Sequence, residues 1–206
     1  MRTLLVSLFM FWFTLPANAC GTLLVFGDSL SAGYGLETGQ GWVDLLQQRL
    51  QEKELPCTVI NASISGDTSA GGLARLKPAL AQHTPDILLL ELGANDGLRG
   101  LSLNAMKSNL TSIIKQAKGA GAKVLLIGMQ MPPNYGPRYT ERFHAIYTKL
   151  ADEQQVPLVP FLMERVALEP SLMQPDNFHP NAQAQPLLLD TVWPHLQPLL
   201  QCANKG

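Results

Sequence analysis

A turn near the C-terminus carries a carboxylate and an imidazole three residues apart, at Asp176 and His179, between Pro175 and Pro180. An aspartate so placed can accept the Nδ1 proton of the histidine, fix its tautomer and leave Nε2 facing a hydroxyl group. Many Asp-x-x-His pairs are surface polar residues, so this pair alone is weak evidence. It predicts general-base chemistry if a nucleophile lies beside it.

Ser29 is the candidate nucleophile. It lies in the segment 27–33, directly after an apolar run, so we expect it at a turn between a strand and a helix. Such a turn lifts the hydroxyl above the sheet and aims the backbone N–H near the helix N-terminus. The alternative interpretation is a serine that caps the helix. With His179 as base and Asp176 orienting it, Ser29 predicts acyl transfer through a covalent intermediate.

Two further segments offer hydrogen-bond donors for an oxyanion. Gly66, within residues 61–68, can bring its backbone N–H close to a ligand because it has no Cβ. Asn95, within residues 93–96, offers a side-chain amide. A tetrahedral intermediate is stabilised by such fixed donors. Each segment, taken singly, can also be an ordinary glycine-containing turn.

The elements that must position these groups follow a regular alternation. Short, continuous apolar runs alternate with segments of helical period, which is typical of buried parallel strands joined by crossover helices. The predicted strands are residues 22–26, 58–61, 87–92, 124–129 and 157–160. Core faces are predicted on two helices, with Trp42, Val43, Leu45, Leu46 and Leu50 on one and Phe143, Ile146, Tyr147 and Leu150 on the other. A last helix is expected over residues 181–201, with Pro186 in its first turn and Pro194 bending it. The sequence therefore predicts an α/β fold, a three-layer, doubly wound, five-stranded parallel sheet.

Ligands of such sheets bind outside the carboxyl ends of the strands. The segments expected at that edge are 27–35, 63–72, 93–100, 129–138 and 175–180. They contain the candidate serine, aspartate and histidine and both oxyanion candidates.

Length and charge exclude several classes. The 206 residues, less an export signal, suit a single domain, predicted over residues 20–206. The net charge of −1 excludes a strongly basic nucleic-acid surface. The proposed chemistry requires no metal or organic cofactor, and the cysteine spacing suits no zinc site.

Residues 1–19 are interpreted as a signal peptide, since Arg2 precedes an apolar stretch and Ala17 and Ala19 form a small-x-small cleavage site. The mature chain would begin at Cys20, without a later membrane span, and the protein would be exported to the periplasm or secreted. A retained anchor and a lipid-modified Cys20 are the alternatives.

Three cysteines, Cys20, Cys57 and Cys202, fit an oxidising compartment with one disulfide and one free thiol. Cys20 and Cys57 each precede a predicted strand, so a bridge between the starts of neighbouring strands is our hypothesis. An unchanged free-thiol count after reduction would refute it.

Four blocks together resemble the SGNH, or GDSL, hydrolase superfamily. They are Gly27-Asp28-Ser29-Leu30-Ser31, Gly66, Gly93-Ala94-Asn95-Asp96 and Asp176-Asn177-Phe178-His179, in the order of the family. Residues 61–69 and 95–100 are similar to the bacterial periplasmic thioesterase I, arylesterase and lysophospholipase group, and this likeness covers nearly the whole mature chain. Departures are Ala94, where relatives often have glycine, and Asn177-Phe178, where Gly-Ile is common.

The resemblance implies a flavodoxin-like SGNH fold and a serine esterase. It implies a catalytic triad of Ser29, His179 and Asp176. It also implies an oxyanion hole made by the backbone amides of Ser29 and Gly66 and the side chain of Asn95.

Apolar residues in the loops after Asn95 and around residues 131–135 suggest a groove for an acyl chain. They are Leu98, Leu101, Met131, Pro132 and Tyr135. The same residues could instead pack the loops together. We expect a monomer that hydrolyses small acyl esters, with medium-chain esters first and thioesters or lysophospholipids as further substrates. One alternative is a carbohydrate O-deacetylase, which a comparison of acetyl with octanoyl esters would distinguish. The other is a non-catalytic small-ligand binding protein, which covalent labelling of Ser29 would exclude.

Overall fold

The computed structural model describes residues 21–201. Its centre is a parallel sheet whose strands lie in the order β2-β1-β3-β4-β5. The strands are β1 (Gly21–Gly27), β2 (Cys57–Asn61), β3 (Ile87–Glu91), β4 (Lys123–Ile127) and β5 (Leu158–Val159). This is the flavodoxin-like order of a doubly wound sheet, and it confirms the predicted fold class.

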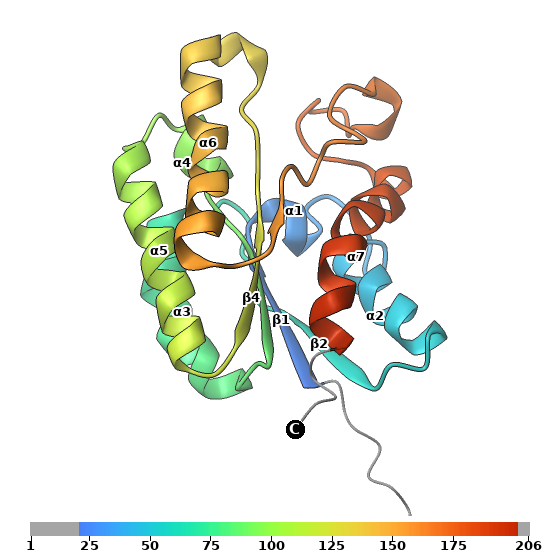
Figure 1. Cartoon of the computed structure of the whole chain (residues 1–206). Helices are drawn as coiled ribbons and strands as arrows, with labels where there is room; N and C mark the ends of the chain where they lie inside the picture. Colours follow the sequence, from blue (N-terminus) through green and yellow to red (C-terminus); the bar gives the residue numbers. More distant parts are fainter. Residues whose placement is uncertain (1–20, 202–206) are drawn as a thin grey trace, which may run out of the picture.

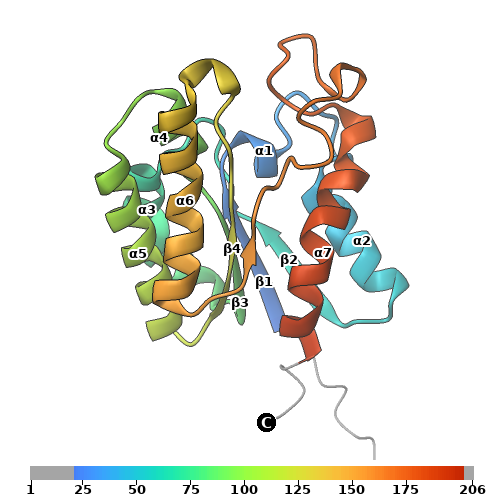
Figure 2. The ribbon, with the colours of Figure 1, turned by 45° about the horizontal axis from the view of Figure 1, so that its top comes forward.

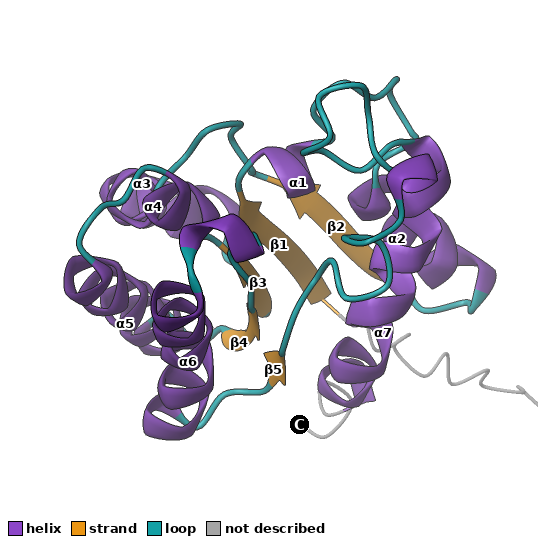
Figure 3. Ribbon diagram, turned by 90° about the horizontal axis from the view of Figure 1, so that it is seen from above, coloured by secondary structure: helices purple, strands orange, loops and turns teal. Residues whose placement is uncertain are grey.

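Helices cover both faces of the sheet (Figure 1). One face carries α3 (Ser69–His83), α5 (Leu103–Gly119) and α6 (Pro137–Gln154), and the other carries α2 (Trp42–Glu52) and α7 (Gln185–Gln201). Figure 3 shows these two groups on opposite sides of the strands. The shorter elements are α1 (Ser29–Ala32), α4 (Ala94–Leu98) and the 3₁₀ turns η1 (Pro133–Tyr135), η2 (Pro170–Leu172) and η3 (Ala182–Ala184).

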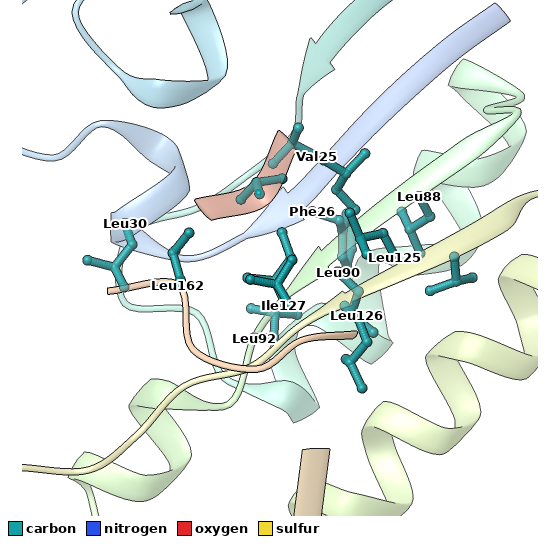
Figure 4. Packing of buried hydrophobic residues seen from close by; sticks show 14 of the residues in the cluster. Val25, Phe26, Leu30, Leu88, Leu90, Leu92, Leu125, Leu126, Ile127 and Leu162 are labelled. Atoms are coloured by element: carbon teal, nitrogen blue, oxygen red, sulfur yellow. The ribbon is translucent and has the colours of Figure 1, made fainter. Parts of the chain in front are cut away.

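The core forms because the central strands are apolar on both faces. Every residue of β3 is buried, and Figure 4 shows side chains of β1, β3 and β4, such as Phe26, Leu90 and Leu126, packed together. The helix faces predicted to be core are buried, except that Leu45 is only half-buried. Continuous apolar runs therefore correspond to the buried strands.

Each strand ends within two residues of its prediction, and the differences at β5 and at the last helix have a clear local cause. β5 is shorter than expected, because Pro157 and Pro160 flank it and proline has no N–H to donate to a sheet. The last helix begins at Gln185 rather than at Asn181, whose side chain instead accepts hydrogen bonds from the 3₁₀ turn η3 that precedes α7. Pro186 lies in the first turn of α7, and the helix continues through Pro194.

Several sequence predictions concern residues outside the described part of the chain. The signal peptide, the possible modification of Cys20 and the cleavage site all lie there. Cys57 is disulfide-bonded, but Cys20 and Cys202 lie outside residues 21–201, so its pairing stays a prediction. Within residues 21–201, no helix is both long and apolar enough to cross a bilayer.

Candidate active site

The three residues predicted to react lie in one hydrogen-bonded chain at the carboxyl edge of the sheet. Ser29 Oγ is 2.9 Å from His179 Nε2, and His179 Nδ1 is 2.7 Å from Asp176 Oδ2. Figure 2 shows α1, which begins with Ser29, at the same edge as the segment that precedes α7. Residues 150 positions apart are thus brought into contact by the fold.

The turn that carries His179 is held by its own backbone. Asp176 Oδ1 accepts hydrogen bonds from the backbone N–H groups of Phe178 (2.9 Å) and His179 (3.0 Å). Asn177 adopts a left-handed conformation, with φ of 55°, which asparagine tolerates better than most side chains. Both oxygens of Asp176 are therefore engaged, one by the turn and one by the imidazole.

These contacts keep the carboxylate of Asp176 ionised. Hydrogen bonds from the backbone and ring of His179 lower the pKa of Asp176 from 3.8 to about 2. An ionised partner at Nδ1 favours the tautomer whose Nε2 is free to accept a proton.

Gln174 joins the histidine turn to the segment after α1. Its backbone N–H donates to the carbonyl of His179 (2.7 Å), and its side-chain Nε2 donates to the carbonyls of Tyr34 (2.8 Å) and Pro180 (3.0 Å). The ring of Tyr34 lies 4.6 Å from the imidazole between centroids. The serine and histidine segments are therefore fixed relative to each other by more than the reacting atoms.

The turn before Ser29 is built around Asp28. This buried side chain caps α1 by accepting from the backbone N–H of Leu30 (3.1 Å), and it also accepts from the side-chain amide of Asn95 (3.0 Å). Burial raises the pKa of Asp28 to about 6, although the donors on Leu30 and Asn95 oppose that rise. Asn95 is thereby held beside the residue that precedes Ser29.

Two of the predicted oxyanion donors, Gly66 and Asn95, both contact Arg99. Arg99 Nη2 donates to the carbonyl of Gly66 (2.8 Å) and approaches Asn95 Oδ1 (3.5 Å). Gly66 has a φ of 79°, which favours glycine. Within residues 21–201 no acceptor pairs with the backbone N–H of Ser29 or of Gly66, so both are available to a ligand.

The loops after β3 and β4 are tied together by two tyrosines. Tyr135 Oη donates to the carbonyl of Leu98 (3.1 Å), and Tyr139 Oη donates to the carbonyl of Gly97 (2.9 Å). Met131 is buried, and a Cβ on Gly97 would meet its Sδ at 2.5 Å. Of the predicted substrate contacts, Leu98 and Pro132 are half-buried and Tyr135 is exposed.

Sequence reasoning missed three residues of this region: Tyr34, Gln174 and Glu91. Tyr34 and Gln174 have no local signal, because their contacts join segments far apart in the chain. Glu91 did carry a local sequence signal, because it is a single charged residue at the end of an apolar strand. In the structure it accepts hydrogen bonds from Asp28 and Ser31, on the two sides of Ser29.

A serine, an imidazole and a carboxylate joined in this order on a doubly wound sheet define the class of serine hydrolases. The chain belongs to the GDSL-like lipase/acylhydrolase family, whose sequence model matches residues 25–186. It is therefore a carboxylic ester hydrolase.

Known relatives are similar over nearly their whole length. Esterase TesA of Pseudomonas aeruginosa is 52% identical over 97% of this chain and 100% of its own. The Escherichia coli protein named thioesterase 1/protease 1/lysophospholipase L1 is 50% identical over 94% of this chain and 91% of its own. The crystal structure of esterase EstA from Pseudoalteromonas sp., inhibited by monoethylphosphonate, matches with a TM-score of 0.84 and 43% identity, over 87% of this chain and 98% of that one.

Proposed function

We propose that the protein hydrolyses carboxylic esters through an acyl-enzyme formed on Ser29. The single observation that carries this assignment is the continuous chain from Ser29 Oγ through the imidazole of His179 to Asp176 Oδ2. Both distances are within hydrogen-bond range, so no rearrangement is needed before proton transfer.

In the first half-reaction His179 Nε2 takes the proton of Ser29 as Oγ attacks the ester carbonyl. The tetrahedral intermediate then collapses, the bond to the leaving alcohol breaks, and the same nitrogen delivers its proton to the leaving oxygen. In the second half-reaction His179 deprotonates water as it attacks the acyl-enzyme. The bond to Ser29 Oγ then breaks, the imidazolium returns the proton to Oγ, and the acid is released. Asp176 stays ionised throughout and stabilises the imidazolium.

The oxyanion would be bound by the backbone N–H groups of Ser29 and Gly66 and by the side-chain amide of Asn95. Two observations support this role: the first two donors are unpaired within residues 21–201, and Asn95 Nδ2 has a second hydrogen beyond the one given to Asp28. Such fixed donors are a large part of catalysis in acyl transfer.

Acyl thioesters and lysophospholipids are proposed as further substrates, since relatives of about 50% identity carry the names thioesterase and lysophospholipase. The acyl chain would lie along Leu98, Met131, Pro132 and Tyr135. Exposed apolar side chains at this edge, such as Leu101 and Tyr135, support a substrate with an apolar chain.

Ester hydrolysis by wild-type protein and by Ser29→Ala tests the assignment. p-Nitrophenyl esters from acetyl to dodecanoyl should be hydrolysed by the wild type, with kcat/KM highest at medium length, and not measurably by the variant. Substantial activity of Ser29→Ala would end the assignment of the nucleophile. A preference for acetyl esters of sugars would instead favour an O-deacetylase.

Export and a monomeric state are proposed as well. Export rests on the signal-peptide pattern of residues 1–19, and N-terminal sequencing of protein from the periplasm should begin at Cys20. Sedimentation should give the mass of one chain.

A further inference from the structure

Glu91, the last residue of β3, is a fully buried carboxyl group next to the nucleophile turn. Its Oε2 accepts hydrogen bonds from the backbone N–H of Asp28 (3.2 Å) and from the hydroxyl of Ser31 (2.7 Å), which lie on either side of Ser29. A Cβ on Gly27 would come within 2.6 Å of the same oxygen. The Glu91 carboxyl group therefore lies against residues on both sides of Ser29, the residue that attacks the ester.

The two oxygens of Glu91 have different surroundings. Oε2 receives both donors, whereas Oε1 is buried and has no hydrogen-bond partner within residues 21–201. An ionised oxygen buried without a donor costs much more free energy than a neutral hydroxyl in the same place. Oε1 is thus the atom on which a proton is favoured.

Asp28, the neighbouring buried carboxyl group, is arranged in the opposite way. Its Oδ1 accepts from the backbone of Leu30 and its Oδ2 from the side chain of Asn95. Donors on both oxygens favour the ionised form of Asp28. Since two adjacent buried carboxylates repel each other, the pair keeps one proton, and the contacts assign it to Glu91.

Most of the charged and titratable groups around the pair do not offset a second negative charge. Burial raises the pKa of Glu91 well above its ordinary value, and the Asp28 carboxyl raises it further. Arg75 reaches the carbonyl of Gly27 but is paired with Asp67. Tyr147 and Asp67 also interact with the pair and bring no positive charge, whereas His179 lowers the pKa of Asp28.

We propose that Glu91 is a positioning residue of this hydrolase, which holds the turn from Asp28 to Ser31 in its reactive geometry as a neutral carboxylic acid. The proposal rests on the assigned role of Ser29. Loss of the proton would place a second negative charge beside Asp28, whose Oδ2 binds the oxyanion donor Asn95. That charge opposes the developing oxyanion and pushes the two carboxyl groups apart, so kcat falls at alkaline pH while KM changes little.

The test compares Glu91→Gln and Glu91→Ala with wild type in kcat and KM across pH. Glutamine keeps an acceptor for Asp28 and Ser31 and is neutral at every pH. Its kcat at neutral pH should stay within about threefold of wild type, and the alkaline decline should disappear. Alanine removes both acceptors, and its kcat should fall about tenfold or more with little change in KM.

Two measurements separate positioning from a general loss of stability. Leu50→Val, a cavity variant in the buried face of α2, should lower the melting temperature but keep the wild-type dependence of kcat on pH. Infrared spectra at neutral pH should contain a protonated-carboxyl C=O band that is lost in Glu91→Gln. That band is independent of activity and of whether Glu91→Ala folds.

An alkaline decline shared by wild type and Glu91→Gln, or infrared spectra without the difference, would overturn the proposal. An unchanged kcat in folded Glu91→Ala would also overturn it. Wild-type protein without esterase activity would count against the proposed function instead, and the infrared band would still decide whether Glu91 is neutral.

Discussion

Replacing Asp176 by asparagine tests how the histidine turn fixes the tautomer of His179. In the structure Asp176 Oδ1 accepts two backbone N–H groups and Oδ2 faces Nδ1. An asparagine that keeps the backbone contacts must point its NH₂ group at Nδ1. That nitrogen then has to accept a hydrogen bond, which puts the proton on Nε2 and prevents it from taking the serine proton.

The alternative rotamer of the asparagine is no better. If the amide oxygen turns to Nδ1, the NH₂ group faces the backbone N–H groups of Phe178 and His179, and two hydrogen bonds are lost. A wrong tautomer in a buried triad costs about 10⁴-fold in kcat. Because the Asp176 side chain is 40% exposed, water partly solvates the imidazolium, and we expect about 10³-fold, or about 4 kcal/mol of activation free energy.

The assay is kcat for p-nitrophenyl octanoate, with Asp190→Asn as the matched control. Asp190 has a similar exposure, 41%, but its partners are Arg49 and Arg165, and it lies on α7, away from the histidine turn. The control should keep wild-type kcat. A loss below about tenfold in Asp176→Asn would refute the role assigned to the carboxylate.

Further changes have defined outcomes. Asn95→Ala removes one oxyanion donor, so kcat should fall about 100-fold or more with KM within a few-fold, measured on the same ester. Gly128→Ala places a Cβ 2.5 Å from the carbonyl oxygen of Pro160, so urea unfolding should show a loss of about 1–3 kcal/mol. In the folded protein the pKa of Asp28 is raised from 3.8 to about 6, so the folded state binds the Asp28 proton more tightly than the unfolded state. This contribution to the free energy of unfolding is fully present below pH 3.8 and is lost as the pH rises through about 6. The melting temperature of wild type minus that of Asp28→Asn should accordingly decrease across that window, as calorimetry can measure.

The sequence predicted the sheet because parallel strands buried on both faces require continuous apolar runs. The run that became β3 is the plainest example, since all its residues are buried. Every predicted strand is present, with ends within two residues of those observed. The start of the last helix was wrong by four residues, because Asn181 caps a 3₁₀ turn that has no distinct sequence pattern.

The candidate site was predictable to the extent that its residues occur in short motifs. Ser29, Asp176 and His179 are such residues, and the fold brings them into contact, while their catalytic roles stay predictions. Gln174 and Tyr34 were not predictable, because their hydrogen bond joins positions 140 residues apart. The proton on Glu91 depends on which donors surround each of its oxygens, and only tertiary structure shows that.

The most direct test of the central claim is to trap the covalent intermediate. Protein incubated with a fluorophosphonate is digested, and the modified residue is located by mass spectrometry. We expect one adduct, on Ser29, at a rate strongly reduced in His179→Ala, because the imidazole activates the hydroxyl. Labelling of a different residue, or labelling of Ser29 that does not depend on His179, would contradict the proposed mechanism.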